Sequence, residues 1–300
     1  MKKAEYSQEE IAQAIGTTQG SISKELSRNS GKRGYRPKQA NQKATKRKRE
    51  KRSRPLVVVG MVEEEVVERL VKNHSPKQIS GKLREQRVFV STEAIYKYVI
   101  EDKRNDGELY KHLRINGKRR YKRRVKDKRK GKILNRRGIE KRPPAVDRRE
   151  RYGDWEADLI EGRKGTGYFL SLYERKSHLG LLVHMDRKGA KGTAGAIVEA
   201  LEGYRVRTLT YDNGLEFAMH GEVDEKLGSK AYFCNPYHSW EKGGVENYNG
   251  LVRQYYPKGS SLEGVDVEEL AKVVMEINER PRETLGFKSP SELEHYLLKN

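Results

Sequence analysis

Apolar residues recur at helical spacing close to the start of the chain. Ile11, Ala12 and Ile15 fall on one face of a helix, with polar residues around them. Ser7 precedes this segment and, with a glutamate three positions later, has the spacing of a capping box. Gly16 is typical of a residue that ends a helix. The pattern predicts a short helix that ends in a turn.

A second helix is predicted to begin near Thr18 and to bury Ile22 and Leu26. The spacing of a small residue, a turn glycine and a β-branched residue is that of a helix-turn-helix, in which two helices approach closely. Here these residues are Ala12, Gly16 and Ile22. The second helix of such a module enters the major groove of DNA. The residues expected to face DNA are Thr18, Gln19, Ser21 and Lys24. An ordinary helical hairpin is the alternative.

Residues 75–99 show a similar pattern. Ser75 is placed as a helix cap, and Ile79 and Leu83 fall on the inner face of the helix that follows. Another helix is predicted to start at Thr92. We interpret this segment as a second helix-turn-helix, and a purely structural pair of helices is the alternative.

After residue 144 the apolar pattern becomes that of strands separated by glycine-containing turns. Four strands are predicted over residues 155–160, 168–173, 180–185 and 208–211. The other predicted elements are a helix over 193–201, a strand over 231–234, a helix from Gly244 and two C-terminal helices over 265–279 and 289–298. Three meandering strands followed by alternating helices and strands predict a mixed α/β sheet.

Positive charge is concentrated in two runs. Residues 32–54 contain twelve Lys or Arg against one acid, and residues 118–142 contain fifteen against two. The net charge of the whole chain is +21, so the remainder is close to neutral. A solvated linker is the alternative for any one run. Two runs of this density indicate a polyanionic partner, and we expect nucleic acid.

The single cysteine, Cys234, excludes an internal disulfide framework and a cysteine-based zinc module. The first residues lack the apolar run of a secretory signal, and no apolar stretch is long enough to span a bilayer. We therefore expect a cytoplasmic protein with no membrane partner. The 300 residues suffice for two or three domains.

Three acids are candidates for metal-dependent phosphoryl transfer, which needs carboxylates from different elements to meet around Mg²⁺. Asp158 lies on the first predicted strand and, by alternation, shares a face with Asp154 and Glu156. Asp212 follows the fourth strand at a turn, where a structural aspartate is the alternative. Glu246 begins the next long helix, where an exposed glutamate is common.

Four segments together resemble one protein family. They are Trp155-Glu-Ala-Asp158, Asp212-Asn-Gly-Leu-Glu-Phe, Glu246-Asn-Tyr-Asn-Gly-Leu-Val-Arg-Gln-Tyr-Tyr-Pro-Lys-Gly and Asn278-Glu-Arg-Pro-Arg-Glu-Thr-Leu-Gly-Phe. In this order they closely resemble the insertion-sequence-thirty family of DDE transposases, and the two helical modules extend the resemblance over nearly the whole chain. Ala157 stands where the family often has glycine, and family members commonly carry another helix before the first helix-turn-helix.

The resemblance implies an α/β, ribonuclease-H-like catalytic core preceded by all-α helix-turn-helix modules. It implies that Asp158, Asp212 and Glu246 are catalytic and hold two Mg²⁺, for which Mn²⁺ can substitute. By the same resemblance Arg253, two helical turns after Glu246, is expected to contact DNA together with Asn249. The implied partners are the inverted-repeat ends of a mobile element, target DNA and further copies of the chain, with no small-molecule substrate.

We therefore expect a transposase that cleaves DNA 3′ ends and transfers the strands. The predicted divisions are a helix-turn-helix with a basic tail (1–54), a second helical module (56–115), a basic linker (116–146), the catalytic core (147–256) and a C-terminal helical segment (257–300). The alternatives are a DNA-binding regulator or inactive relic and a structure-directed nuclease. The intact carboxylates argue against the first, and the two DNA-reading modules argue against the second.

Overall fold

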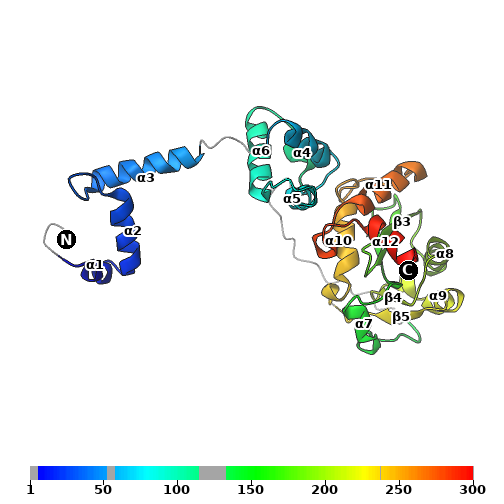
Figure 1. The fold of residues 1–300 in the computed structure, drawn as a ribbon. Helices are drawn as coiled ribbons and strands as arrows, with labels where there is room; N and C mark the ends of the chain where they lie inside the picture. The colour runs from blue at the N-terminus through cyan, green and yellow to red at the C-terminus, as the bar shows by residue number, and fades with distance from the viewer. Residues whose placement is uncertain (1–5, 53–57, 115–132, 237, 300) are drawn as a thin grey trace. The chain divides into compact units, whose positions relative to one another are not determined.

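The computed structural model describes residues 6–52, 58–114, 133–236 and 238–299. The chain forms two compact units, Met1–Val57 and Val58–Asn300 (Figure 1). The first unit contains helices α1 (Gln8–Ala14), α2 (Gln19–Asn29) and α3 (Pro37–Arg52). The second contains the remaining helices and the sheet. The finer division into five segments stays a prediction.

Helices α1 and α2 form where the apolar and capping patterns predict them. The hydroxyl of Ser7 accepts a hydrogen bond from the Glu10 amide, and the Glu10 carboxylate accepts one from the Ser7 amide at 2.7 Å. Gly16 follows α1 with φ +66°, a conformation that favours glycine. Thr18 caps α2. Ile15 is 59% exposed, so the prediction that it joins the buried face of α1 was wrong.

Helix α3 contains most of the first basic run, for which no helix was predicted. Its apolar positions show little periodicity, but alanine, glutamine, lysine and arginine are strong helix formers. Lys43 donates a hydrogen bond to the Ser30 carbonyl at 2.6 Å, and Arg47 donates to the Arg28 carbonyl at 2.8 Å. These cations therefore bind the carbonyl end of α2, which carries partial negative charge.

The second unit begins with three helices, α4 (Met61–Val71), α5 (Pro76–Glu85) and α6 (Thr92–Arg104). They enclose a separate apolar cluster of Val58, Val66, Leu70, Ile79, Leu83, Val90, Ile95 and Val99. Ser75 caps α5 with a capping box that includes Gln78. The predicted helices and their inner faces are confirmed. Helix α4 was not predicted, although Val62, Val66 and Leu70 have helical spacing.

A five-stranded mixed sheet follows. Its strands are β1 (Asp154–Glu161), β2 (Tyr168–Glu174), β3 (Gly180–Met185), β4 (Thr208–Tyr211) and β5 (Lys230–Phe233), in the order β3-β2-β1-β4-β5. The helices are α7 (Pro144–Asp147), α8 (Ala190–Ala200), α9 (His220–Leu227), α10 (Gly243–Val252), α11 (Val267–Glu279) and α12 (Pro290–Lys299). Strands β1, β2 and β3 are antiparallel, whereas β4 runs parallel to β1 and β5 parallel to β4. The mixed α/β prediction is confirmed, and this topology is ribonuclease-H-like.

Helices cover both faces of the sheet (Figure 1). On one face, Trp155 and Ala157 of β1 pack in a cluster with residues of α8 and α9. On the other face, Ile160 packs in a cluster with residues of α10 and α11. The acidic residues of β1 share one face of the strand, as the sequence predicted, and this face points toward α10. Among the described residues, no helix is long and apolar enough to cross a membrane.

Candidate active site

The parallel pairing of β1 with β4 determines which acids become neighbours. Asp154 pairs with Thr208, and Glu156 pairs with Thr210. The same register, continued two residues along each strand, brings Asp158 beside Asp212. The two aspartates are separated by 53 intervening residues in the sequence, and they approach because the neighbouring strands that carry them run in the same direction.

Two further acids on this face of β1 have structural partners. Asp154 is 1% exposed; it binds Arg151 at 2.9 Å and accepts a hydrogen bond from the Thr208 hydroxyl at 2.7 Å. Glu156 is fully buried, forms an ion pair with Arg175 and accepts a hydrogen bond from the first turn of α10. A buried carboxylate with such partners is already neutralised. Asp158 is the acid of this face that extends toward Asp212.

The ammonium group of Lys242 lies between the two aspartates. Its Nζ is 2.9 Å from Asp158 Oδ1 and 3.4 Å from Asp212 Oδ2. The Lys242 side chain is only 6% exposed, and Nζ also donates to the Ala157 carbonyl at 3.3 Å. Burial acts to lower the pKa of Lys242, but the two aspartates outweigh it, so the pKa lies above its ordinary value. Two carboxylates from neighbouring strands thus converge on one cation.

Helix α10 completes this arrangement. Asn249 donates from Nδ2 to Asp158 Oδ2 at 2.8 Å. Lys242, Glu246 and Asn249 are spaced four and three residues apart, so they lie on one face of the helix. Glu246 is exposed in the first turn. In the described part of the chain, no three acidic, histidine or cysteine side chains form a group that could hold a metal ion.

The donor groups near Asp158 suit a hard cation. Carboxylate oxygens and amide carbonyl oxygens are the ligands that Mg²⁺ and Mn²⁺ prefer. The carboxylates of Asp158 and Asp212 already hold the Lys242 ammonium. The Oδ1 atom of Asn249 is buried and has no hydrogen-bond partner among the described residues. A divalent ion therefore fits here if Lys242 releases the carboxylates.

Asp212 also has the local role that its turn position suggests. Its Oδ1 accepts a hydrogen bond from the Gly214 amide at 2.8 Å, and Asn213 donates to the Cys234 carbonyl at 2.8 Å. The first bond lies within the turn after β4, and the second holds this turn against the end of β5. The turn leaves Oδ2 directed at Lys242, so the structural role and a site role are compatible.

Lys242 was not among the residues predicted from the sequence. A signal was present, because Lys242 precedes Glu246 by four residues and therefore shares its helical face. The contact itself depends on the packing of α10 against β1 and on the pairing of β1 with β4, and neither can be predicted from a local sequence pattern.

The residues predicted to contact DNA lie in two places. Thr18, Gln19, Ser21 and Lys24 are all exposed at the start of α2. The Thr18 hydroxyl caps the helix and bonds to the Ser21 hydroxyl at 2.9 Å. Arg253 ends α10, is half-buried and donates to the Glu161 carbonyl at 2.8 Å. Asn249 faces Asp158 within the candidate active site.

Comparisons with known proteins identify close relatives. The transposase for insertion sequence element IS4351 of Bacteroides fragilis is 38% identical over 297 residues, which cover 97% of this chain and 91% of the relative. Transposase InsI for insertion sequence element IS30A of Escherichia coli (strain K12) is 35% identical over 94% of this chain and 77% of its own length. The transposase for insertion sequence element IS1086 of Cupriavidus metallidurans is 35% identical over 100% of this chain and 92% of its own.

Similar solved structures include the catalytic core domain of BIV integrase, which is 24% identical with a TM-score of 0.38 and covers 48% of this chain and 96% of that one. A chain of the simian T-cell lymphotropic virus intasome in complex with PP2A regulatory subunit B56 gamma is 18% identical with a TM-score of 0.40, covering 48% of this chain and 54% of that one. No family model matches the sequence. Because relatives at 34–38% identity extend over nearly the whole chain, this protein belongs to the insertion-sequence-thirty (IS30) family of transposases, polynucleotidyl transferases of the DDE type.

Proposed function

We propose that this transposase cleaves DNA at the inverted-repeat ends of its mobile element and joins the 3′ ends to target DNA, with Asp158, Asp212 and Glu246 as its metal-holding carboxylates. The observation that carries the proposal is the convergence of Asp158 and Asp212 on the cation of Lys242. Glu246 is assigned as the third carboxylate because it lies one helical turn from Lys242 on the same face.

The family uses divalent metal ions, and we propose two Mg²⁺ per site, with Mn²⁺ as a substitute. When bound, these ions supply a nucleophilic oxygen at neutral pH and stabilise charge on the departing 3′ oxygen. The protein contributes position and charge. Asn249 orients Asp158 through its amide, and the turn at Gly214 orients Asp212. Lys242 neutralises the aspartate pair until the carboxylates bind a divalent ion.

The proposed activity is tested on duplex DNA that carries the repeats flanking the gene. We expect strand cleavage at the 3′ ends in Mg²⁺ and in Mn²⁺, and loss of cleavage in excess EDTA with DNA binding retained. Gel analysis of end-labelled duplexes measures both steps. A protein that binds these ends but cleaves them with neither metal would support the regulator alternative instead.

We expect the exposed residues of α2 to read the element ends. Replacing Gln19 and Lys24 by alanine should weaken binding to an inverted-repeat duplex by about 1–3 kcal/mol for each base that the variant no longer hydrogen-bonds. Binding to random duplex should change much less. Fluorescence anisotropy with both duplexes measures the difference, and an equal loss of affinity for both would show that α2 contacts only phosphates.

We further propose a homo-oligomer that pairs two element ends in the bacterial cytoplasm at the nucleoid.

The second basic run, residues 118–142, supports DNA contact through charge alone, because its density of positive charge exceeds any plausible set of base contacts. Residues 118–132 of this run lie outside the described residues, and residues 133–142 precede the first strand of the sheet.

A further inference from the structure

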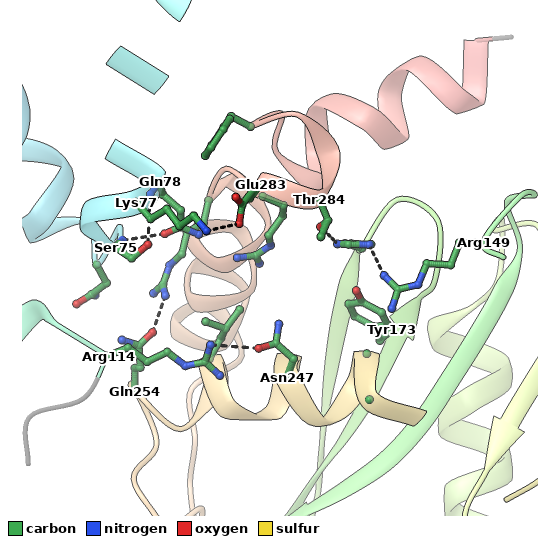
Figure 2. Close-up of a pocket in the computed structure, with 18 residues that line it drawn as sticks. Ser75, Lys77, Gln78, Arg114, Arg149, Tyr173, Asn247, Gln254, Glu283 and Thr284 are labelled. Atoms are coloured by element: carbon green, nitrogen blue, oxygen red, sulfur yellow. Dashed lines mark hydrogen bonds and ion pairs between the residues drawn. The ribbon is translucent and has the colours of Figure 1, made fainter. Parts of the chain in front are cut away.

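A cavity of about 380 Å³ lies within the second unit, where α5, α10 and the segment after α11 meet. Four arginines line it, namely Arg114, Arg149, Arg280 and Arg282, and we call it the arginine pocket. Figure 2 shows Arg114 and Arg149 reaching it from opposite sides, with Asn247 of α10 lying between them. The volume falls within the usual range of ligand sites, about 300–1,000 Å³.

Three of the four arginines have no carboxylate partner among the described residues. Within the described part of the chain, Arg149, Arg280 and Arg282 form no ion pair with a carboxylate. Glu283, the one acid among the described residues that line the pocket, is bound by Lys77 at 2.7 Å. Arg280 is 1% exposed, and its Nε is buried with no hydrogen-bond partner in the described residues. Arg280 therefore carries a buried charge that no described carboxylate neutralises, and such a charge is costly without a counter-ion.

Burial, and after it this positive charge, lowers the pKa of two groups that line the pocket. Burial and the nearby Arg280 lower the pKa of Arg282 to about 10. Burial, with Arg149 and Arg282, lowers the pKa of His178 to about 4. His178 is therefore neutral near pH 7, and its Nε2 accepts a hydrogen bond from Arg149 at 2.7 Å. This bond holds the Arg149 guanidinium at the pocket without neutralising it.

Backbone strain is also concentrated here. Arg149, His178 and Phe287 line the pocket and have positive φ angles of 54°, 64° and 65°. Residues other than glycine adopt this conformation at only a few per cent of positions, because it is sterically strained. Strained residues persist where surrounding structure requires a particular side-chain position, so their location supports a binding role.

The arginines are not needed to fasten α5 to the rest of the unit. Gln78 donates to the Pro281 carbonyl at 2.7 Å, and Lys77 pairs with Glu283 at 2.7 Å. Phe287 packs directly against Gly81 of α5. These contacts already join the two segments. A role of the arginines in holding the segments together therefore does not explain the excess positive charge.

We propose that the arginine pocket binds a backbone phosphate of the DNA strand on which the transposase acts, a site that depends on the function proposed above. Planar guanidinium groups donate paired hydrogen bonds that match phosphate oxygens. Helix α10 connects this pocket to the carboxylates, since its Asn247 binds Arg114 at 3.1 Å and its Asn249 binds Asp158 at 2.8 Å. A strand held in the pocket is thereby positioned relative to Asp158.

This proposal gives a role to the segment Asn278–Phe287, one of the four matching motifs. The segment supplies Arg280 and Arg282 to the pocket, and Asn278 anchors it by exchanging hydrogen bonds of 2.9 and 2.7 Å with the backbone of Gly180 on β3. The anchor connects the pocket wall to the sheet that carries the aspartates.

The test uses the whole 300-residue chain and leaves the deeply buried Arg280 unchanged. The variant R149Q/R282Q removes two positive charges from the pocket, and R149K/R282K keeps them. The control R205Q/K272Q removes two exposed charges elsewhere in the unit. Binding to an inverted-repeat duplex is measured against salt concentration, and phosphate ethylation identifies the phosphates whose modification weakens binding. Thermal unfolding verifies that every variant is folded.

For R149Q/R282Q we expect the log–log salt slope to fall by about 0.9, the value for one phosphate contact. One site of ethylation interference seen with wild type should also disappear. The lysine variant should retain most of the slope, and the control should keep the interference site. An unchanged interference pattern in folded R149Q/R282Q would overturn the pocket assignment. Absence of any wild-type complex with the duplex would instead contradict the proposed function.

Discussion

Replacing Asp158 or Asp212 by asparagine, or Glu246 by glutamine, should abolish end cleavage while DNA binding stays near wild type. Each substitution removes one negative oxygen ligand and keeps the size of the side chain. Loss of one ligand weakens metal binding and misaligns the attacking oxygen together, so each variant should lose at least about a thousand-fold in rate. Double variants should be no worse than single ones, because the three residues act as a unit.

The structure identifies which nearby acid is a fair control. Asp154 and Glu156 are buried and ion-paired, so their replacement would disturb the fold. Asp186 has a 92% exposed side chain and belongs to none of the matching motifs. D186N should therefore cleave normally. Comparable cleavage by wild type and by folded D158N or E246Q would show that the carboxylate assignment is wrong.

Replacing Lys242 by methionine should lower stability without metal and increase the stabilisation that Mg²⁺ provides. Without the ammonium, Asp158 and Asp212 repel each other in a partly buried place. Breaking a fully buried pair costs about 3–5 kcal/mol. Since the Asp158 and Asp212 side chains are 21% and 42% exposed, we expect a smaller loss of about 1–3 kcal/mol. Thermal unfolding in EDTA measures this loss.

Titration of Mg²⁺ into the same protein then tests competition. Binding to the folded state raises its stability according to the ratio of free metal to dissociation constant. Without Lys242 as a competing cation, the dissociation constant for Mg²⁺ should fall. Addition of Mg²⁺ should then raise the melting temperature of K242M more than that of wild type. The matched control is K82M, since Lys82 also lies between two carboxylates, Glu85 at 3.0 Å and Glu292 at 3.5 Å. An equal Mg²⁺ response in K242M, K82M and wild type would exclude competition at this place.

Local patterns were sufficient for most of the elements. Alternation around the predicted strand at residues 155–160 identified β1 and the face of Asp158, because side chains of a strand point to opposite sides in turn. The capping boxes at Ser7 and Ser75 marked two helix starts, since their hydrogen bonds lie within four residues. Helix α3 was not predicted, because polar residues surround it and no apolar stripe marks a buried face. Its helicity depends instead on the helix propensity of its residues.

The sequence by itself therefore determined the five strands and most of the helices, the concentration of positive charge and the motif acids of an IS30-family transposase. Tertiary structure alone decided that Asp212 lies beside Asp158, that Lys242 binds both, and that Arg149, Arg280 and Arg282 meet in one pocket. The physical reason is the range of the interactions. Periodicity and capping act over a few residues, whereas strand register and helix packing join side chains that are tens of residues apart.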